Sequence, residues 1–293
     1  MSSQERENEE DRAVSPTDTA LRVERSQAEY LLRAQPSEID RLRRQSLAWE
    51  PAGRNLLREF EPPRAARAVD LGCGSLGWLR LLSEWVGPGG SVVGTDIDPL
   101  LLGHATDFCR QERLEGVTLV EDDLFASNLS PATFDLVHAR FQVSPLGRAE
   151  DIVDTMLRLV RPGGLIVLED PSAASWRFHP AAPATDQLVQ HILTAFAASG
   201  GCFDAGEQNV QTLRRRGLDV EIRAAVLGLD FRDPYLRLPL QFAHSLRAAL
   251  SEQMGAVQLD ALIAASEKEL SDSRTWGLSF TLIQVAARAA PEG

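Results

Sequence analysis

Cysteine, lysine and long apolar runs are all scarce in this chain. The three cysteines, Cys73, Cys109 and Cys202, are odd in number and widely spaced, and no CxxC pair or Cys/His metal spacing occurs. We therefore expect no metal site, and a reducing cytoplasm fits this cysteine usage best. The N-terminal residues are acidic and polar and lack the apolar core of a signal peptide, so export is not expected.

No stretch of about 18 uninterrupted apolar residues is present, which argues against a membrane-spanning helix. Basic charge is also in deficit: 30 Lys and Arg stand against 42 Asp and Glu, and the formal net charge is -12. An acidic protein does not suit binding to nucleic acid through phosphates or docking on an anionic membrane. We expect neither partner.

The remaining composition is that of an ordinary globular protein. The 293 residues are 44% hydrophobic and 25% charged, which allows one large domain with an appendage or two modest domains. Residues 1–25 read as a disordered acidic tail. Residues 26–62 are predicted to form two or three short helices, which end at Pro62 and Pro63.

From residue 66 onward, short apolar strands alternate with amphipathic helices. This alternation predicts an α/β fold with a parallel, doubly wound sheet. The expected strands are 66–71, 91–95, 117–120, 134–139 and 165–168, and the expected helices between them are 77–85, 99–113 and 149–160. Farther along, strands at 218–227 and 278–287 flank a mostly helical stretch at 236–272.

The strongest local motif lies where the first strand meets its helix, at Gly72-Cys73-Gly74-Ser75-Leu76-Gly77. Glycines there permit a tight turn and close approach of a ligand to the backbone, and the helix N-terminus adds free N–H groups. Read literally, this is the G-x-G-x-x-G pattern of dinucleotide-binding proteins, with Asp96 as the following acid. A nicotinamide-dependent oxidoreductase is therefore one alternative.

Further motifs follow in a fixed order: Val92–Asp96, Glu121–Leu124, Phe134–Arg140 and Arg161–Gly164. Together with the glycine loop, they resemble the class I S-adenosylmethionine (SAM)-dependent methyltransferases. The similarity is to the small-molecule branch, which is related to quinone-biosynthesis and secondary-metabolite enzymes. It covers roughly residues 64–170 well and the flanks loosely.

The resemblance implies a Rossmann-like, doubly wound, seven-stranded sheet with an antiparallel last strand, N-terminal helices and a helical lid. It places the SAM-binding domain at residues 63–290, with lid insertions at about 171–215 and 230–275. In this family the seventh strand inserts antiparallel between the fifth and the sixth. The late runs 218–227 and 278–287 would supply these last two strands.

The resemblance also implies how the cofactor SAM is held. Asp70 and the glycine loop would hold its methionine part, Asp96 both ribose hydroxyls, and Asp123, or else Asp122, the adenine amino group. The implied cofactor contacts are Tyr30, Asp70, Gly72, Cys73, Gly74, Asp96, Ile97, Asp123, Leu124, His138, Ala139 and Arg140.

Two departures from the family pattern affect the expected chemistry. Many relatives carry glycine where Leu76 stands, whereas here the third glycine is Gly77, so the methionine end of the cofactor would be held differently or more weakly. Relatives often carry a second histidine shortly after His138-Ala139-Arg140, but here Phe141-Gln142-Val143-Ser144-Pro145 follows. The identity of any catalytic base is therefore open.

Methyl transfer mainly requires alignment of the acceptor and, where needed, removal of a proton. The candidate catalytic residues are His138, His179 and Asp170, each of which also has a structural interpretation: a half-buried histidine, a turn histidine before Pro180, and a turn cap. Acceptor contacts are expected from Trp176, Phe178, His179, Phe242 and His244. An ordinary aromatic core beneath a lid would give the same list.

The sequence thus favours a cytoplasmic enzyme that transfers a methyl group from SAM to O, N or C of a small apolar or aromatic acceptor, in secondary metabolism, and that forms a homodimer. Three alternatives stay open. They are a non-methylating cyclisation or pericyclic step on the same fold, a non-catalytic SAM-binding module, and the nicotinamide-dependent oxidoreductase named above.

Overall fold

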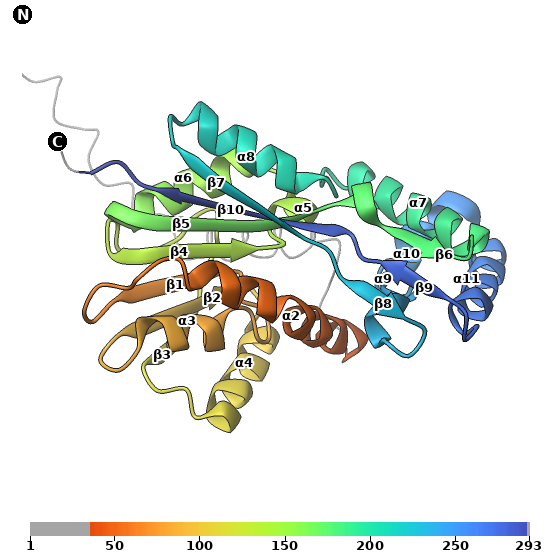
Figure 1. Ribbon diagram of the computed structural model, residues 1–293, viewed down its shortest axis with the longest axis horizontal. Coiled ribbons are helices and arrows are strands. Elements are labelled where there is room, and N and C mark those ends of the chain that lie inside the picture. Colours follow the sequence, from red (N-terminus) through yellow and green to blue (C-terminus); the bar gives the residue numbers. More distant parts are fainter. Residues whose placement is uncertain (1–35, 292–293) are drawn as a thin grey trace, which may run out of the picture.

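A seven-stranded sheet in the order β3-β2-β1-β4-β5-β10-β7 forms the centre of the computed structural model, which describes residues 36–291 (Figure 1). Six strands run in one direction, and β10 lies antiparallel to them between β5 and β7. The predicted Rossmann-like sheet with its antiparallel last strand is confirmed. The strands are β1 (Arg67–Leu71), β2 (Ser91–Asp96), β3 (Val117–Glu121), β4 (Phe134–Arg140), β5 (Val160–Ser172), β7 (Val220–Ala225) and β10 (Thr281–Arg288).

Helices cover both faces of this sheet, because successive side chains of a strand point to opposite faces and both sets are apolar. In β1, for example, Ala68 packs in the core of one face and Val69 in the core of the other. The first face is covered by α3 (Leu79–Val86), α4 (Pro99–Glu112) and the end of α2 (Pro36–Leu57). The second is covered by α5 (Val143–Leu146), α6 (Ala149–Leu159) and α8 (Ala205–Arg215).

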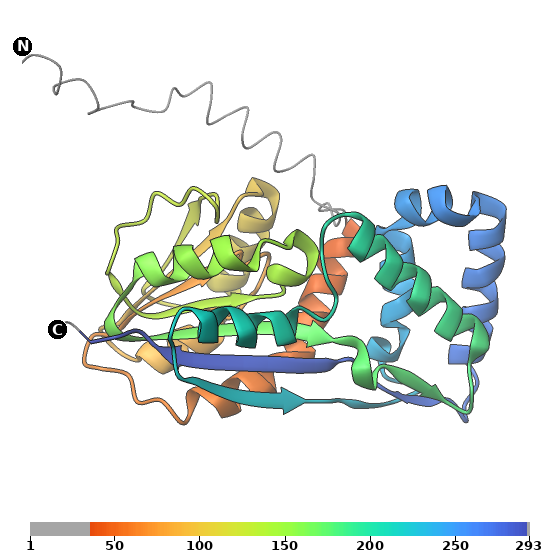
Figure 2. The same ribbon diagram turned by 90° about the horizontal axis from the view of Figure 1, so that it is seen from above.

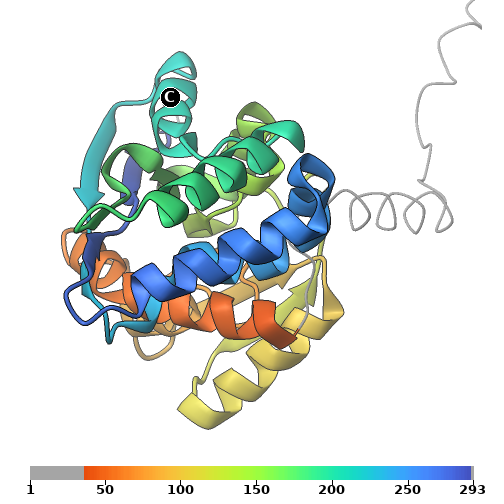
Figure 3. The same ribbon diagram turned by 90° about the vertical axis from the view of Figure 1, so that its right-hand side faces the viewer.

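A second layer of structure, which we call the cap, lies beyond the carboxyl ends of β4 and β5 (Figure 2). It shares one hydrophobic core, in which Trp49 of α2 and Phe280 are buried with residues of the cap helices. Figure 3 shows α11 beside α7 at this end of the molecule, and α2 packs against α9. The cap consists of β6 (Arg177–His179), α7 (Pro183–Ala198), β8 (Gly228–Asp230), α9 (Leu238–Ser245), α10 (Arg247–Met254), α11 (Ala256–Leu270) and β9 (Trp276–Leu278).

The three cap strands repeat the order of the sheet edge from which they emerge. Their order is β6-β9-β8, and the adjacent main-sheet strands are ordered β5-β10-β7. Each cap strand is separated by only a few residues from its main-sheet counterpart, as β8 (Gly228–Asp230) is from β7 (Val220–Ala225). The cap is therefore connected to the sheet by three neighbouring strands rather than by one hinge.

The elements outside the sheet differ in several respects from the sequence predictions. The described part of segment 26–62 holds one continuous helix, α2, which passes through Pro51, instead of two or three short ones. Within 171–215, β6 and α7 belong to the cap but α8 does not, because α8 carries apolar side chains such as Leu213 onto the main sheet. The stretch 236–272 is divided into α9, α10 and α11, and the second break is Gly255 with its positive φ. The predicted tail 1–25 and Tyr30 lie outside the described residues.

The structure also bears on membrane association. Within residues 36–291, none of the helices combines the length and the apolar character that crossing a bilayer would require.

Candidate active site

A cavity of about 610 Å³ lies between the carboxyl ends of the parallel strands and the cap. In open α/β sheets, ligands bind at this edge, where the strand order reverses, here between β1 and β4. One end is lined by the glycine loop and by acidic residues that follow β2 and β3. The other end is lined by α2, by the segment after β4, and by phenylalanines of the cap and of the segments that connect it to the main sheet.

The glycine loop at the first end needs each of its glycines where it stands. Gly72, Gly74 and Gly77 all have φ between 46° and 65°, a region that side chains disfavour. A Cβ on Gly77 would lie 2.2 Å from Asp70 Oδ2, so the displaced third glycine is what lets the loop close over Asp70. A Cβ on Gly74 would meet nothing within 4 Å, so the backbone there is open to the cavity. Cys73 also lines the cavity, and burial raises the pKa of its thiol well above the usual range.

Asp96 joins this loop to the end of β2. Its Oδ2 accepts a hydrogen bond from the Gly74 N–H at 2.8 Å, and its Oδ1 accepts one from the Asp98 N–H at 2.9 Å. Asp98 in turn caps α4 by accepting from the Leu100 N–H, with Pro99 in the first helical turn. Burial raises the pKa of Asp96 to about 6. The carboxylate faces the cavity beside Ile97.

Two further aspartates follow β3 and line the same end of the cavity. Asp123 Oδ1 accepts from the Phe125 N–H at 2.9 Å, a contact that shapes the turn. Asp122 Oδ1 accepts from the Asn128 N–H at 2.9 Å, but its Oδ2 is buried with no hydrogen-bond partner among the described residues. A buried carboxylate oxygen without a donor is costly, and a donor on a ligand would relieve that cost. Leu124 lies beside them on the cavity wall.

Below the loop, polar side chains form a row across the sheet. Asp70 pairs with His138 and Glu169 with Gln284, and Glu169 lies two residues after the partner of His138, so all four point to the same face from β1 to β10. His138 Nδ1 lies 2.7 Å from Asp70 Oδ1, and His138 Nε2 lies 3.3 Å from Glu169 Oε2. Gln284 Nε2 donates to Glu169 Oε1 at 2.5 Å. Burial acts to lower the pKa of His138, but the two carboxylates outweigh it and raise that pKa.

This row places the predicted histidine behind the glycine loop. His138 is fully buried, its ring stacks on Trp78 with centroids 3.8 Å apart, and it does not line the cavity. Asp70 does line the cavity, and its Oδ2 accepts from the Trp78 N–H at 2.6 Å. Ala139, the next residue of β4, points to the other face of the sheet and is buried there. His138 thus holds Asp70 in place instead of facing a ligand.

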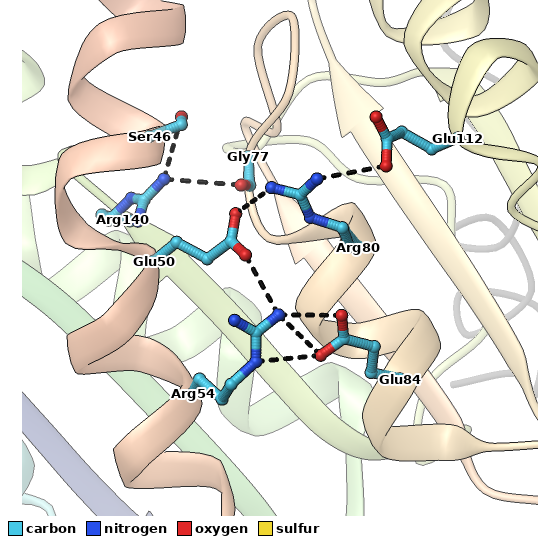
Figure 4. Close-up of polar contacts among 8 residues, drawn as sticks. All are labelled: Ser46, Glu50, Arg54, Gly77, Arg80, Glu84, Glu112 and Arg140. Carbon is cyan, nitrogen blue, oxygen red and sulfur yellow. Dashed lines mark hydrogen bonds and ion pairs between the residues drawn. The ribbon is translucent and has the colours of Figure 1, made fainter.

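Arg140 reaches from the end of β4 to the glycine loop and to α2 (Figure 4). Its Nη2 donates to Ser46 Oγ at 3.0 Å and to the Gly77 carbonyl at 3.4 Å, and its Nη1 lies 3.8 Å from Glu169 Oε2. Nη1 is buried and makes no hydrogen bond within the described part of the chain. Arg140 was predicted to contact the cofactor, and it lines the cavity.

Ion pairs fix α2 against the helix that follows the glycine loop. Arg80 contacts Glu50 of α2 and, at 3.1 Å, Glu112 of α4, while Arg54 of α2 pairs with Glu84 at 2.8 Å (Figure 4). These contacts set the position of the α2 residues that line the cavity, which the sequence analysis did not identify. Those residues are Arg41, Leu42, Gln45 and Ser46.

Phenylalanines line the other end of the cavity. Phe242 was predicted there and is present, together with Phe141, Phe196, Phe203 and Phe280. Their rings meet edge to face, for example Phe196 with Phe242 at 5.7 Å and Phe203 with Phe280 at 5.5 Å between centroids. Trp176 lies one layer farther out, stacked on Phe203 at 5.3 Å, and does not line the cavity.

Phe141 and Gln142 line the cavity but were not assigned to the site in the sequence analysis. Phe141 has a positive φ of 55°, which is uncommon for a bulky residue, and it turns the chain after β4. Gln142 then lies over the glycine loop and donates from Nε2 to the Gly72 carbonyl at 3.0 Å. A Cβ on Gly72 would lie 2.4 Å from the Gln142 amide, which explains why this position is glycine.

The remaining predicted catalytic and acceptor residues lie away from the cavity. Asp170 is buried, accepts from the Ser144 N–H and from Asn209 Nδ2 at 2.9 Å each, and burial raises its pKa to about 7. His179 stacks on Trp276 in the cap sheet at 4.5 Å. Phe178 is buried in the cap core, and His244 is exposed on α9.

The sheet order and the antiparallel last strand define the class as the Rossmann-like methyltransferase fold. The family described as "Methyltransferase domain" matches residues 68–164. The chain is 31% identical over 207 residues to a nocamycin O-methyltransferase of Saccharothrix syringae, covering 64% of this chain and 70% of that protein. It therefore belongs to the class I SAM-dependent methyltransferases of the small-molecule branch.

Other relatives match over shorter spans. A demethylmenaquinone methyltransferase of Anoxybacillus flavithermus is 26% identical over 43% of this chain and 52% of its own length, so the chain spans about half of that relative. Among solved structures, the YcgJ protein of Bacillus subtilis has a TM-score of 0.58 at 15% identity, covering 83% of this chain and all (100%) of that one. At such identity, the likeness concerns the fold alone.

Proposed function

We propose that this protein binds SAM at the glycine-loop end of the cavity and transfers its methyl group to a small, apolar or aromatic acceptor bound at the phenylalanine end. The observation that carries the proposal is the open backbone at Gly74, set among acidic side chains from three successive strand ends. Backbone N–H groups are the donors, and carboxylates the acceptors, that a nucleoside with an amino-acid tail requires.

The residues present fit this cofactor. Asp96 would accept from the ribose hydroxyls, and Asp122 Oδ2 or Asp123 from the adenine amino group. Support for Asp122 comes from its buried, unpartnered Oδ2. Arg140, beside Gly77 and with Nη1 free of hydrogen bonds to described residues, would bind the methionine carboxylate. When bound, SAM supplies an electrophilic methyl group on a sulfonium.

The chain's own contribution would be binding and orientation. The cap and α2 enclose the phenylalanine end, which would exclude water and hold a flat acceptor against the rings. None of the described residues lining the cavity is a histidine, lysine or tyrosine. His138 would act as a positioning residue that keeps Asp70 and the loop in place. The cytoplasmic location, the role in secondary metabolism and the homodimer remain predictions from the sequence.

The test is calorimetric titration of the full chain with SAM, S-adenosylhomocysteine and NADH. We expect both adenosyl ligands to bind and Asp96→Ala to weaken them by about 10- to 100-fold, because hydrogen bonds to a charged group contribute about 1.5–3 kcal/mol each. Asp107→Ala, an exposed aspartate on α4, is the matched control and should leave both affinities unchanged. Unchanged affinity in Asp96→Ala, or binding of NADH alone, would contradict the proposal.

A product screen separates methyl transfer from the non-methylating alternative on the same fold. Each candidate acceptor is incubated with protein and SAM, and masses are compared. A gain of one methyl group, with formation of S-adenosylhomocysteine, supports transfer. An isomeric product with SAM left intact supports the cyclisation or pericyclic reading.

A further inference from the structure

We propose that the acceptor is an anion, a carboxylate or a comparably acidic enol or phenol attached to a flat apolar body, and that Arg41 of α2 binds its charge. This inference rests on the proposed function, because it assigns the acceptor class for the cavity end that SAM leaves free. It concerns binding and selectivity, so it can be tested without turnover.

The first support is the separation of charge along the cavity. The described carboxylates that line it are Asp70, Asp96, Asp98, Asp122 and Asp123, all at or just after the ends of β1, β2 and β3. The cationic lining residues are Arg41 and Arg140, which lie on the side of α2 and β4. A ligand that fills the whole cavity would therefore meet acidic groups at its nucleoside end, Arg140 beside the glycine loop and Arg41 at its acceptor end.

The second support is the position of Arg41 within the aromatic end. Its Cζ lies 4.8 Å from the centroid of Phe242, and its Nη1 donates to Gln45 Oε1 at 2.6 Å. The residue is only 3% exposed, and Gln45 is similarly buried. The ring and the amide hold the guanidinium against the cavity wall. A guanidinium presents a fixed fork of N–H groups that matches a carboxylate or two neighbouring oxygens.

The two arginines lie at different ends of the cavity, so each would contact a different ligand. Arg140 contacts the Gly77 carbonyl, so it belongs to the glycine-loop end, where we place the cofactor's amino-acid tail. Arg41 contacts Phe242, which packs on Phe196 and Phe203 in the cap, so it belongs to the acceptor end. A cation in a water-poor, aromatic wall favours an anionic group over a neutral one of the same shape.

The third support is that the described residues at this end of the cavity include no suitable base. The cavity lining among the described residues offers no imidazole, amine or phenol, and its carboxylates are at the nucleoside end. An oxygen that arrives ionised carries no proton for the protein to remove. An anionic acceptor therefore fits both the presence of Arg41 at this end of the cavity and the absence of a base among its described lining residues.

The test compares 2-naphthoate with 2-naphthamide, which have nearly the same shape but differ in charge. Both are titrated into the full chain saturated with S-adenosylhomocysteine, and dissociation constants are measured by calorimetry. We expect naphthoate to bind about tenfold more tightly than the amide. In Arg41→Gln this preference should disappear, and in Arg41→Lys, which keeps the charge, part of it should return. Arg44→Gln, an exposed arginine on the same helix, is the matched control.

The outcomes separate failure of the inference from failure of the proposed function. If S-adenosylhomocysteine does not bind, the proposed function itself fails. If it binds but naphthoate shows no preference over the amide, or neither probe binds, the anionic-acceptor inference is overturned. If Arg41→Gln weakens S-adenosylhomocysteine while methylthioadenosine, which lacks the carboxylate, binds as before, Arg41 belongs to the cofactor tail and the inference is also overturned. Thermal melts of each variant check that α2 stays folded.

Discussion

Asp96 is the residue whose protonation state should be visible in ligand binding. Burial raises the pKa of its carboxyl to about 6, so the group is ionised at pH 8 and largely protonated at pH 5. A protonated carboxyl loses acceptor capacity towards the two hydroxyls that we assign to it.

We therefore expect the affinity for S-adenosylhomocysteine to be constant above about pH 7 and to fall, by at most about tenfold per pH unit, below about pH 6. Calorimetric titrations between pH 5 and 8 measure this dependence. Asp96→Asn, which does not titrate, should bind more weakly at pH 8 and show a flat profile. A wild-type profile as flat as that of the variant would mean that another group carries the ribose contact.

At the scale of single residues, the sequence predicted those site residues whose type is dictated by the local backbone. Gly72, Gly74 and Asp96 are identified by spacing because the turn and the strand end dictate them. Gly77 was interpreted as a weakened motif, but its Cβ position beside Asp70 Oδ2 shows that the loop requires it. His138 was ambiguous because a histidine at a strand end faces a ligand or a neighbouring strand with equal ease, and the register of β1 with β4 decides the matter.

At the scale of elements, α8 is held against the sheet at a glycine. A Cβ on Gly206 would lie 2.5 Å from Ile283 Cβ and 2.9 Å from the Asp170 carbonyl. Neither neighbour is free to move, because one lies in β10 and the other in β5. The close approach also allows Asn209 of α8 to donate to Asp170.

We therefore expect Gly206→Ala to lower the free energy of unfolding by about 1–3 kcal/mol, through steric displacement of α8. Gly103, on the exposed side of α4, has open space at its Cβ position and is the matched control. Gly103→Ala should raise stability by about 0.5–1 kcal/mol, because alanine favours helix over glycine. Urea unfolding of both variants measures the contrast, and equal effects of the two substitutions would contradict the proposed close packing of α8.

Element prediction succeeded for the sheet and failed for the segments around it, for a physical reason. Parallel strands buried on both faces give clear apolar runs, such as Leu165-Ile166-Val167-Leu168 of β5, which are all buried. The short cap strands β6, β8 and β9 have three residues each, too few for a periodic pattern. Arg41 and Gln45 were missed because a polar residue on a helix gives no local sign that its helix turns that face towards a cavity.

At the scale of the whole molecule, a hydrogen bond joins α2 to the cap. Trp49 Nε1 donates to Tyr235 Oη at 2.8 Å, and both side chains are buried. The Trp49 ring also packs against Phe280 at 5.2 Å between centroids. The first described helix, the cap and the last strand of the sheet therefore meet at one point.

We expect Trp49→Phe and Tyr235→Phe each to cost about 1–3 kcal/mol, since each leaves one buried polar group unpaired. The double variant should lose about 0.5–3 kcal/mol less stability than the sum of the two single variants. The reason is that the second change removes the polar group that the first one leaves unpaired. Thermal or urea unfolding of the four proteins completes the cycle. As a control, Trp85→Phe removes a distant bond to the Phe60 carbonyl and should be additive with Tyr235→Phe. Additivity of the Trp49 and Tyr235 changes would refute the coupling.

The pairing of β8 with β9 has a consequence for how such a molecule can change over evolutionary time. Asp230 lies opposite Trp276 in this antiparallel pair, so the chain leaves for α9, α10 and α11 and returns at adjacent points. The entropy of closing a loop between fixed ends grows only slowly with its length. These three helices form one insertion between neighbouring points of the chain. Their length can therefore change without altering the register of the main sheet or the glycine loop. The same main sheet could thus carry different sets of cap helices, each suited to a different small molecule.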